Sequence, residues 1–280
     1  MTTSRTITIS NGVSLNAIEA GTGQPLIMIP GWSQSAAEYG RNIEALARDR
    51  RVIALDMRSH GESPNAETGH RIQRLAKDLS EVIEALGLDS VDLLGHSMGS
   101  SIIWSYLDLF GPAKLRRLVL VDQAPMAAAL PGWSEAEKNR FGCLLPDVQS
   151  VAALCDTVRT TASVDGTMGI LKGMFTAAFP EADLRWIAQE NLKMPRAAAA
   201  DLLFDHCLND WRDVIERTRL PSLVVGGAKS IFSAESQEWI ASVNPNARAV
   251  IFGENEGGGH FMFFENPKRF NAEVASFLTS

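Results

Sequence analysis

Short, nearly continuous apolar runs alternate with helical patterns along most of this chain of 280 residues. The apolar runs lie at 26–29, 52–55, 91–94, 118–121, 223–225 and 249–252. Apolar residues recur at helical spacing at 38–47, 72–86, 98–110, 235–241 and 267–278. Strands that are apolar on both sides are typical of a parallel sheet buried between two layers of helices. The alternation therefore predicts a doubly wound α/β fold.

The beginning of the chain has a different pattern. Residues 6–9 and 13–18 alternate apolar and polar side chains on either side of Asn11-Gly12. Asn-Gly favours the two-residue turns that connect antiparallel strands. We therefore expect a hairpin here, with both strands half exposed.

The alternation stops between Pro125 and Cys207, where the sequence reads as several short helices. This interruption predicts an α/β core in two parts, 1–124 and 208–280, with a helical cap at 125–207 inserted between them.

Charge and composition exclude several classes of partner. Lys and Arg total 26 against 33 Asp and Glu, a net charge of −7, and the basic residues are scattered, so we expect no nucleic-acid partner. No apolar run approaches the about 20 residues of a membrane span, and residues 1–25 lack the apolar stretch of a signal peptide. We expect a cytoplasmic protein that does not bind membranes. Oligomeric state is left open.

Gly95-His96-Ser97-Met98-Gly99 lies directly between an apolar run and a helical pattern. A G-x-S-x-G motif in this setting forms a sharp turn that exposes the serine hydroxyl above the sheet. We therefore interpret Ser97 as a nucleophile rather than a serine that merely caps the helix. The backbone N–H of Met98, at the start of the helix, would stabilise an oxyanion.

A second oxyanion donor is expected in Pro30-Gly31-Trp32, which follows the first buried strand. Gly31 lets the backbone turn, so the N–H of Trp32 can point toward the same oxyanion. The Trp32 indole either packs structurally or lines a substrate pocket.

Together these segments resemble the α/β-hydrolase fold superfamily, in its serine esterase-like branch with an N-terminal hairpin and a helical cap. The resemblance also includes Asp56-Met57-Arg58-Ser59-His60-Gly61-Glu62-Ser63 and covers nearly the whole chain. It implies a mostly parallel, eight-stranded sheet with helices on both faces. Ser59 stands where the family usually has glycine, so we expect a small backbone adjustment there.

The family places its catalytic base in a loop after the last strand, and His260 follows Gly257-Gly258-Gly259 at that position. A neutral imidazole can accept the serine proton near pH 7, so the resemblance makes His260 the base. We expect structural roles for the other histidines: His60 in a turn, His96 inside the elbow, and His70 and His206 at the surface or in the cap.

The catalytic acid departs from the family pattern. Most members have it shortly after the strand at 223–227, where this chain has Ser230. The family also uses the end of the preceding strand, where Asp122 follows residues 119–121. We therefore assign Asp122 as the acid. It could instead only cap the loop into the insertion, and Glu254 and Glu256 remain alternatives.

The insertion is rich in large apolar side chains and supplies no arginine pair for a phosphate or carboxylate substrate. Some of these side chains would form the cap's own core. We expect a small, mainly apolar substrate bound by Trp32, Met126, Trp133, Phe141, Trp186 and Phe261.

The predicted function is a serine hydrolase that cleaves a carboxylic ester, lactone or related acyl bond. A partial resemblance to the cofactor-free dioxygenases that cleave 3-hydroxy-4-quinolones gives an alternative, in which His260 and the acid deprotonate the substrate. A ligand receptor that kept the fold is a third hypothesis. No metal-binding or phosphate-binding motif occurs in the sequence, so we expect neither a metal nor another cofactor.

Overall fold

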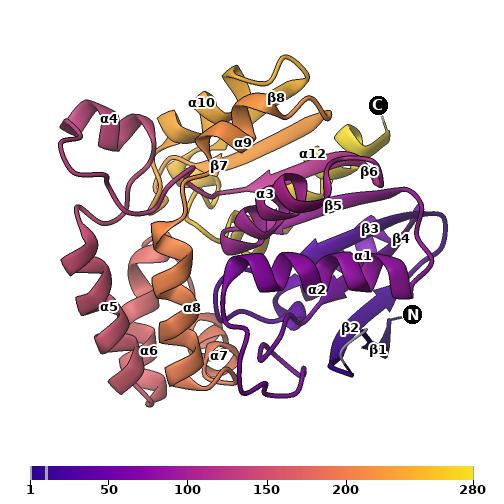
Figure 1. Cartoon of the computed structure of the whole chain (residues 1–280), viewed down its shortest axis with the longest axis horizontal. Helices are drawn as coiled ribbons and strands as arrows, with labels where there is room; N and C mark the ends of the chain where they lie inside the picture. Colours follow the sequence, from indigo (N-terminus) through magenta and orange to yellow (C-terminus); the bar gives the residue numbers. More distant parts are fainter. Residues whose placement is uncertain (1, 10–11, 280) are drawn as a thin grey trace.

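The computed structural model describes residues 2–9 and 12–279, which form one eight-stranded sheet covered by helices (Figure 1). The strands are β1 (Thr3–Thr8), β2 (Ser14–Ala20), β3 (Gln24–Ile29), β4 (Arg50–Leu55), β5 (Val91–His96), β6 (Leu115–Val121), β7 (Ser222–Gly227) and β8 (Ala247–Phe252). Their order is β1-β2-β4-β3-β5-β6-β7-β8. The β1–β2 and β2–β4 pairs are antiparallel and all the others are parallel. The predicted mostly parallel, eight-stranded sheet is confirmed.

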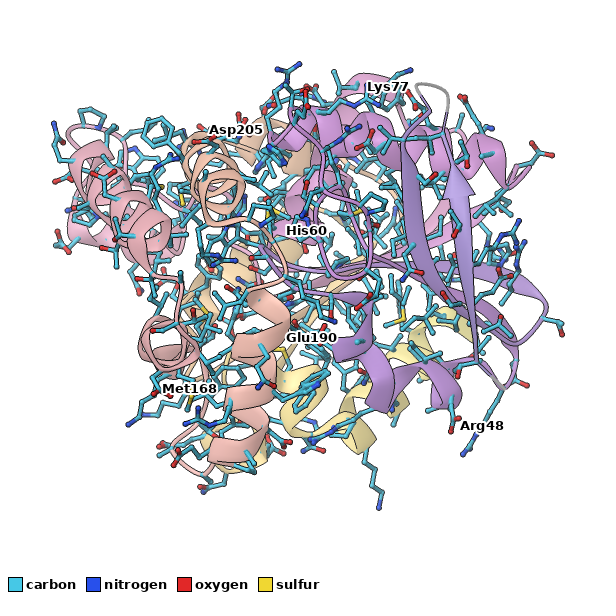
Figure 2. The ribbon with its side chains drawn as sticks, turned by 90° about the horizontal axis from the view of Figure 1, so that it is seen from below. Arg48, His60, Lys77, Met168, Glu190 and Asp205 are labelled. Carbon is cyan, nitrogen blue, oxygen red and sulfur yellow. The ribbon has the colours of Figure 1, made fainter. Side chains whose placement is uncertain are left out.

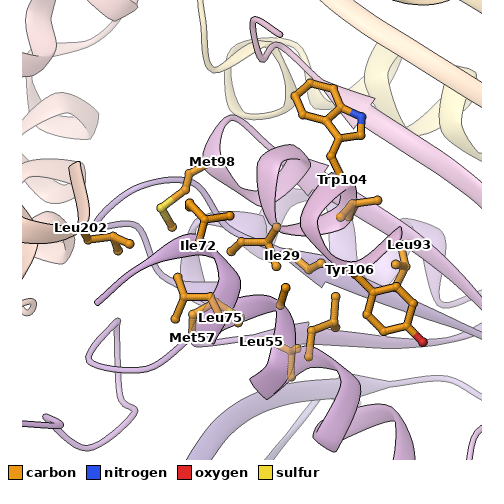
Figure 3. Packing of buried hydrophobic residues seen from close by; sticks show 14 of the residues in the cluster. Ile29, Leu55, Met57, Ile72, Leu75, Leu93, Met98, Trp104, Tyr106 and Leu202 are labelled. Atoms are coloured by element: carbon orange, nitrogen blue, oxygen red, sulfur yellow. The ribbon is translucent and has the colours of Figure 1, made fainter. Parts of the chain in front are cut away.

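Alternate side chains of the inner strands face two different cores. On β3, Ile27 and Ile29 join one buried cluster while Leu26 and Met28 join another, because successive side chains of a strand point to opposite faces. The first cluster contains residues of α2 (Ile72–Ala85), α3 (Met98–Phe110) and α10 (Ala234–Ser242), part of which is drawn in Figure 3. The second contains residues of α1 (Gly40–Leu46), α11 (Met262–Glu265) and α12 (Pro267–Thr279). Helices on both faces are thus confirmed.

The segment between β6 and β7 is helical. Its helices are α4 (Glu135–Arg140), α5 (Val148–Thr160), α6 (Val164–Leu171), α7 (Glu181–Asn191), α8 (Arg196–Leu208) and α9 (Arg212–Arg217). Helices α5 to α8 gather at one side of the sheet, whereas α4 lies against α10 (Figure 1). No helix in the described part of the chain is long and apolar enough to cross a membrane.

The N-terminal hairpin is present, but β1 is more exposed than expected. Ile7 is the one buried residue of β1, because β1 is the edge strand and has a neighbour on one side only. Asn11, half of the predicted turn, lies outside the described residues. Gly12 has a φ of 76°, in the region that favours glycine.

Candidate active site

Ser97 occupies the turn between β5 and α3. Its φ is 51° and its ψ is −123°, and a positive φ is unusual for a residue other than glycine. Gly95 and Gly99 allow this turn, because a methyl group on Gly95 would lie 2.4 Å from the carbonyl carbon of Gly99, and one on Gly99 would lie 2.4 Å from the carbonyl oxygen of Ile29. The turn therefore requires both glycines of the motif.

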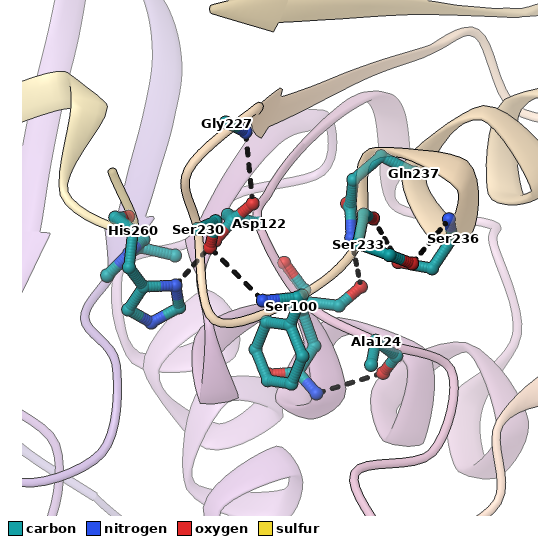
Figure 4. A network of polar contacts seen from close by, with 12 residues as sticks. Ser100, Asp122, Ala124, Gly227, Ser230, Ser233, Ser236, Gln237 and His260 are labelled. Carbon is teal, nitrogen blue, oxygen red and sulfur yellow. Dashed lines mark hydrogen bonds and ion pairs between the residues drawn. The ribbon is translucent and has the colours of Figure 1, made fainter. Parts of the chain in front are cut away.

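His260 and Asp122 lie in direct contact. Nδ1 of His260 is 2.5 Å from Oδ2 of Asp122, the residue immediately after β6 (Figure 4). The same Oδ2 accepts a hydrogen bond from the Ser230 hydroxyl, and Oδ1 accepts one from the backbone N–H of Gly227 at 3.3 Å. The serine at the family's usual acid position therefore donates to the carboxylate on the neighbouring strand.

The two other acidic candidates point elsewhere. Glu254 is paired with Lys229 at 3.3 Å, and Glu256 with Arg269 at 2.6 Å, both largely exposed to solvent. Within residues 2–9 and 12–279, neither glutamate forms a hydrogen bond or ion pair with His260, so Asp122 is the carboxylate that the structure brings to the imidazole.

Burial controls the protonation of this pair. It lowers the pKa of His260 to about 3, so the imidazole is neutral near pH 7. Burial also raises the pKa of Asp122, while its hydrogen bonds from Ser230 and Gly227 oppose that rise. Since Asp122 faces Nδ1, a hydrogen on Nδ1 leaves the Nε2 lone pair free to accept a proton.

The backbone on both sides holds His260 in place. Its N–H donates to the carbonyl oxygen of Met174 at 2.7 Å, and its own carbonyl oxygen accepts from Nε2 of His96 at 2.8 Å. Nδ1 of His96 is 2.9 Å from Oε1 of Gln34, which also accepts the Gly31 N–H at 2.7 Å. His96 thus connects the histidine loop with the loop after β3.

The loop after β3 lies directly against the elbow. A methyl group on Gly31 would be 3.1 Å from Cβ of Ser97. Within residues 2–9 and 12–279, no hydrogen bond engages the N–H of Trp32 or of Met98. The Met98 N–H lacks a partner because it is the first residue of α3, where helical N–H groups are unsatisfied. Two N–H groups beside Ser97 are therefore free to bind an oxyanion.

The same loop is anchored on its far side. Ser33 has a φ of 55°, its N–H donates to Nε2 of His60 at 3.1 Å, and its hydroxyl donates to the carbonyl oxygen of Asn191 at 2.7 Å. Ser35 donates to Glu190 at 2.6 Å, where α7 meets the core (Figure 2). These contacts fix the loop between the core and the helices inserted after β6.

The segment from Asp56 to Ser63 supports this anchor. Nδ1 of His60 donates to the carbonyl oxygen of Arg58 at 2.8 Å, which leaves Nε2 to accept from Ser33. Ser59 has a φ of 62°, the left-handed region that glycine adopts most easily. Its hydroxyl accepts the Ala66 N–H at 2.9 Å and lies 3.0 Å from Nε2 of His70.

A cavity of about 300 Å³ opens above Ser97 and His260. Its walls are mostly apolar and come from the core and from α5, α6, α7 and α8. The apolar side chains include Trp32, Leu154, Val158, Ile170, Leu203, Phe232 and Phe261. A cavity of this size and character fits a small apolar molecule.

Two of the six expected substrate contacts, Trp32 and Phe261, line this cavity. Met126, Trp133, Phe141 and Trp186 are not among the residues that line it, so a substrate contact of these four stays a prediction.

Each of these four side chains packs elsewhere. Trp133 lies 5.1 Å from Phe141, ring centre to ring centre, and the Arg212 guanidinium covers both rings. Trp186 stacks on Phe264, and Met126 is buried in the protein interior. Their apolar surface is therefore used for packing.

His206 and Cys207 on α8 are lining residues that the sequence reasoning did not assign to the site. Helical spacing places four residues of α8 on one face of the helix: Ala199, Leu203, His206 and Cys207. This spacing is the sequence signal that could have predicted a buried helix face. Among the described residues, no cluster of three or more His, Cys, Asp or Glu side chains could hold a metal ion.

Comparisons with known proteins agree with this architecture. A family model described as "alpha/beta hydrolase fold" matches residues 24–267. A proline iminopeptidase from Heyndrickxia coagulans is 27% identical over 274 residues, covering 94% of this chain and 93% of the relative. A non-heme haloperoxidase from Rhodococcus erythropolis is 26% identical over 282 residues, covering 98% and 99%.

Solved structures give the same result for the fold. An esterase from Exiguobacterium antarcticum superposes with a TM-score of 0.88 at 24% identity, covering 99% of this chain and 100% of that chain. At this identity the similarity demonstrates the fold and nothing finer.

Proposed function

Because the chain belongs to the α/β-hydrolase fold family, we propose that it is a serine hydrolase acting on a carboxylic ester, lactone or related acyl bond. The observation that carries the proposal is the 2.5 Å contact of His260 with Asp122 at a cavity that Ser97 also lines. In this proposal Ser97 is the nucleophile, His260 the base and Asp122 the acid that orients it.

The proposed reaction proceeds in two steps. Nε2 of His260 accepts the Ser97 proton while the hydroxyl oxygen attacks the substrate carbonyl, and the N–H groups of Trp32 and Met98 bind the resulting oxyanion. His260 then protonates the leaving alcohol, and Ser97 remains acylated. Water, activated by the same imidazole, hydrolyses the acyl-enzyme and restores the Ser97 hydroxyl.

The cavity supports a small, mainly apolar substrate. Most lining side chains are apolar, and none of them is an arginine or lysine that could neutralise a substrate carboxylate or phosphate. We propose that the helical segment 125–207 is a cap that selects the substrate, since α5, α6 and α8 supply much of this wall.

The test is labelling with a fluorophosphonate probe followed by intact-mass analysis. Wild-type protein should gain one label rapidly, and Ser97→Ala should gain none. A series of apolar p-nitrophenyl esters and lactones would then define the substrate. Oxygen consumption on a 3-hydroxy-4-quinolone, measured in parallel, tests the dioxygenase alternative. Oxygen uptake that survives Ser97→Ala but not His260→Ala, without labelling, would overturn the hydrolase proposal.

A further inference from the structure

His206 lies in the wall of the cavity that contains Ser97. It belongs to α8, which packs against α5, and its side chain is 5% exposed. Its neighbours in the wall are apolar: Leu154, Val158 and Leu203 come from the same two helices. His206 is also close enough to His260 for the two rings to interact electrostatically. A polar ring therefore stands in an apolar wall near the reacting groups.

This imidazole is not satisfied by the protein. Among the residues that the structure describes, none forms a hydrogen bond with either ring nitrogen of His206, and Nδ1 is buried. An unpartnered buried polar group destabilises a protein, because its lost hydrogen bonds to water are not replaced. Leucine or phenylalanine would fill the same wall without that cost. The unpaired imidazole therefore lowers the stability of the protein, and a hydrogen bond with an oxygen of a bound molecule would offset that loss.

The His206 ring is uncharged near pH 7. Burial lowers the pKa of His206 to about 4, and a neutral imidazole offers one N–H donor and one lone pair. It can therefore bind a hydroxyl or a carbonyl without a counter-charge. A carboxylate or phosphate would enter this wall without a cation and would be disfavoured.

Other polar side chains of the wall each have at least one hydrogen-bond partner in the protein. The Trp32 indole N–H donates to the carbonyl oxygen of Ala199 at 2.7 Å, and Oδ1 of Asn191 accepts from Arg196 at 3.0 Å. Oε1 of Gln34 accepts the Gly31 N–H at 2.7 Å. These hydrogen bonds hold the wall together, whereas neither ring nitrogen of His206 has a hydrogen-bond partner among the described residues.

We propose that His206 is a specificity-determining residue that forms a hydrogen bond with a neutral oxygen group on the apolar part of the substrate. The substrate class is then an acyl compound whose apolar part carries a hydroxyl or keto group in addition to the scissile bond. This inference rests on the proposed hydrolase function.

The first test compares two p-nitrophenyl esters of equal chain length, one with a plain acyl chain and one with a keto or hydroxyl group on that chain. The ratio of their kcat/KM values reports the contribution of the extra oxygen. His206→Leu should lower this ratio 10- to 100-fold, and His206→Gln, which keeps a donor and an acceptor, should restore part of it. His70→Leu, a histidine outside the cavity, is the matched control and should leave the ratio unchanged. An unchanged ratio in His206→Leu, for every position of the oxygen along the chain, would overturn the proposal.

The second test does not depend on turnover. Binding of acetophenone and ethylbenzene, which differ in one carbonyl oxygen, is measured by calorimetry on Ser97→Ala and on Ser97→Ala with His206→Leu. The preference for acetophenone should fall at least fivefold in the double variant, whereas equal preferences would contradict the role of His206. Failure of fluorophosphonate labelling would reject the proposed hydrolase function, whereas the binding comparison tests His206 independently of that function. Thermal unfolding adds a check, because removal of an unsatisfied ring should leave the melting temperature of His206→Leu equal or higher, whereas a structural role would lower it.

Discussion

Substitution of Asp122 by asparagine tests the proposed mechanism most directly. The structure dictates how the amide would orient: the Gly227 N–H, 3.3 Å from Oδ1, can only donate and therefore attracts the amide oxygen. The amide NH₂ is then directed toward His260, whose Nδ1 must accept instead of donate. The hydrogen of the neutral ring moves to Nε2, which can no longer accept the Ser97 proton. A wrong tautomer of this kind lowers kcat by about 10⁴ in a serine protease, and we expect a loss of about 10³ to 10⁴, or about 4 to 5.5 kcal/mol.

The assay is steady-state hydrolysis of a plain p-nitrophenyl ester, with thermal unfolding as the check on folding. Asp122→Asn removes a buried group whose pKa is already raised by burial, so the variant should remain folded. Glu254→Gln and Glu256→Gln are the matched controls, and both should retain activity within about twofold because these carboxylates pair with exposed cations. Turnover of Asp122→Asn within tenfold of wild type would show that Asp122 does not set the tautomer of His260.

A steric contact at Gly99 and the burial of two histidines lead to further measurable effects. Gly99→Ala should destabilise the protein by at least about 3 kcal/mol in urea unfolding, since the added methyl meets the Ile29 carbonyl oxygen at 2.4 Å, whereas Gly169→Ala, with open space in a helix, should be neutral or slightly stabilising. Burial lowers the pKa of His60 to about 4; since the unfolded chain binds its proton near pH 6.5, this histidine lowers stability as pH falls from 6.5 to 4, by up to about 1.4 kcal/mol per unit. His60→Gln should therefore flatten the dependence of the unfolding free energy on pH in that window. Burial also lowers the pKa of His260, so kcat/KM should keep its full value down to a pH below 6.5 and then fall as the imidazole is protonated; an acid limb centred above 6.5 would contradict this.

Local sequence patterns predicted the helices and strands of the fold. Motif residues at the ends of single strands were predicted to form the candidate site. The helix expected from Met98 to Phe110 has those bounds in the structure, because Gly95-His96-Ser97 ends the strand before it and Gly111 terminates it. The cavity could not be predicted in the same way. Trp133 was expected at the substrate because it is large and apolar, but the Arg212 guanidinium, 79 positions further along the chain, covers its ring. His206 was expected to have a structural role at the surface or in the cap. Its lack of a hydrogen-bond partner depends on how the helices around it pack, and the neighbouring sequence does not indicate it.

The position of the acid is explained by the pairing of two strands. Val121 at the end of β6 is in register with Val225 of β7, and the Asp122 N–H donates to the Val225 carbonyl oxygen at 2.8 Å. Neighbouring strands lie about 4.8 Å apart, so a carboxylate after either strand can reach the same imidazole. Ser230 stands where the alternative acid would be and stabilises the Asp122 carboxylate through a hydrogen bond.

This arrangement predicts opposite effects of Ser230→Asp in two backgrounds. With Asp122 present, two carboxyl groups would share one buried site, one of them would stay protonated, and kcat should fall together with the melting temperature. When Ser230→Asp is combined with Asp122→Ala, the site again has one carboxylate, and this carboxylate can reach His260. The kcat of this double variant should be at least tenfold above that of Asp122→Ala alone. Kinetics of the four proteins of this cycle measure the coupling between positions 122 and 230. If Ser230→Asp has the same effect in both backgrounds, the two positions do not serve one imidazole, and the explanation from strand pairing fails.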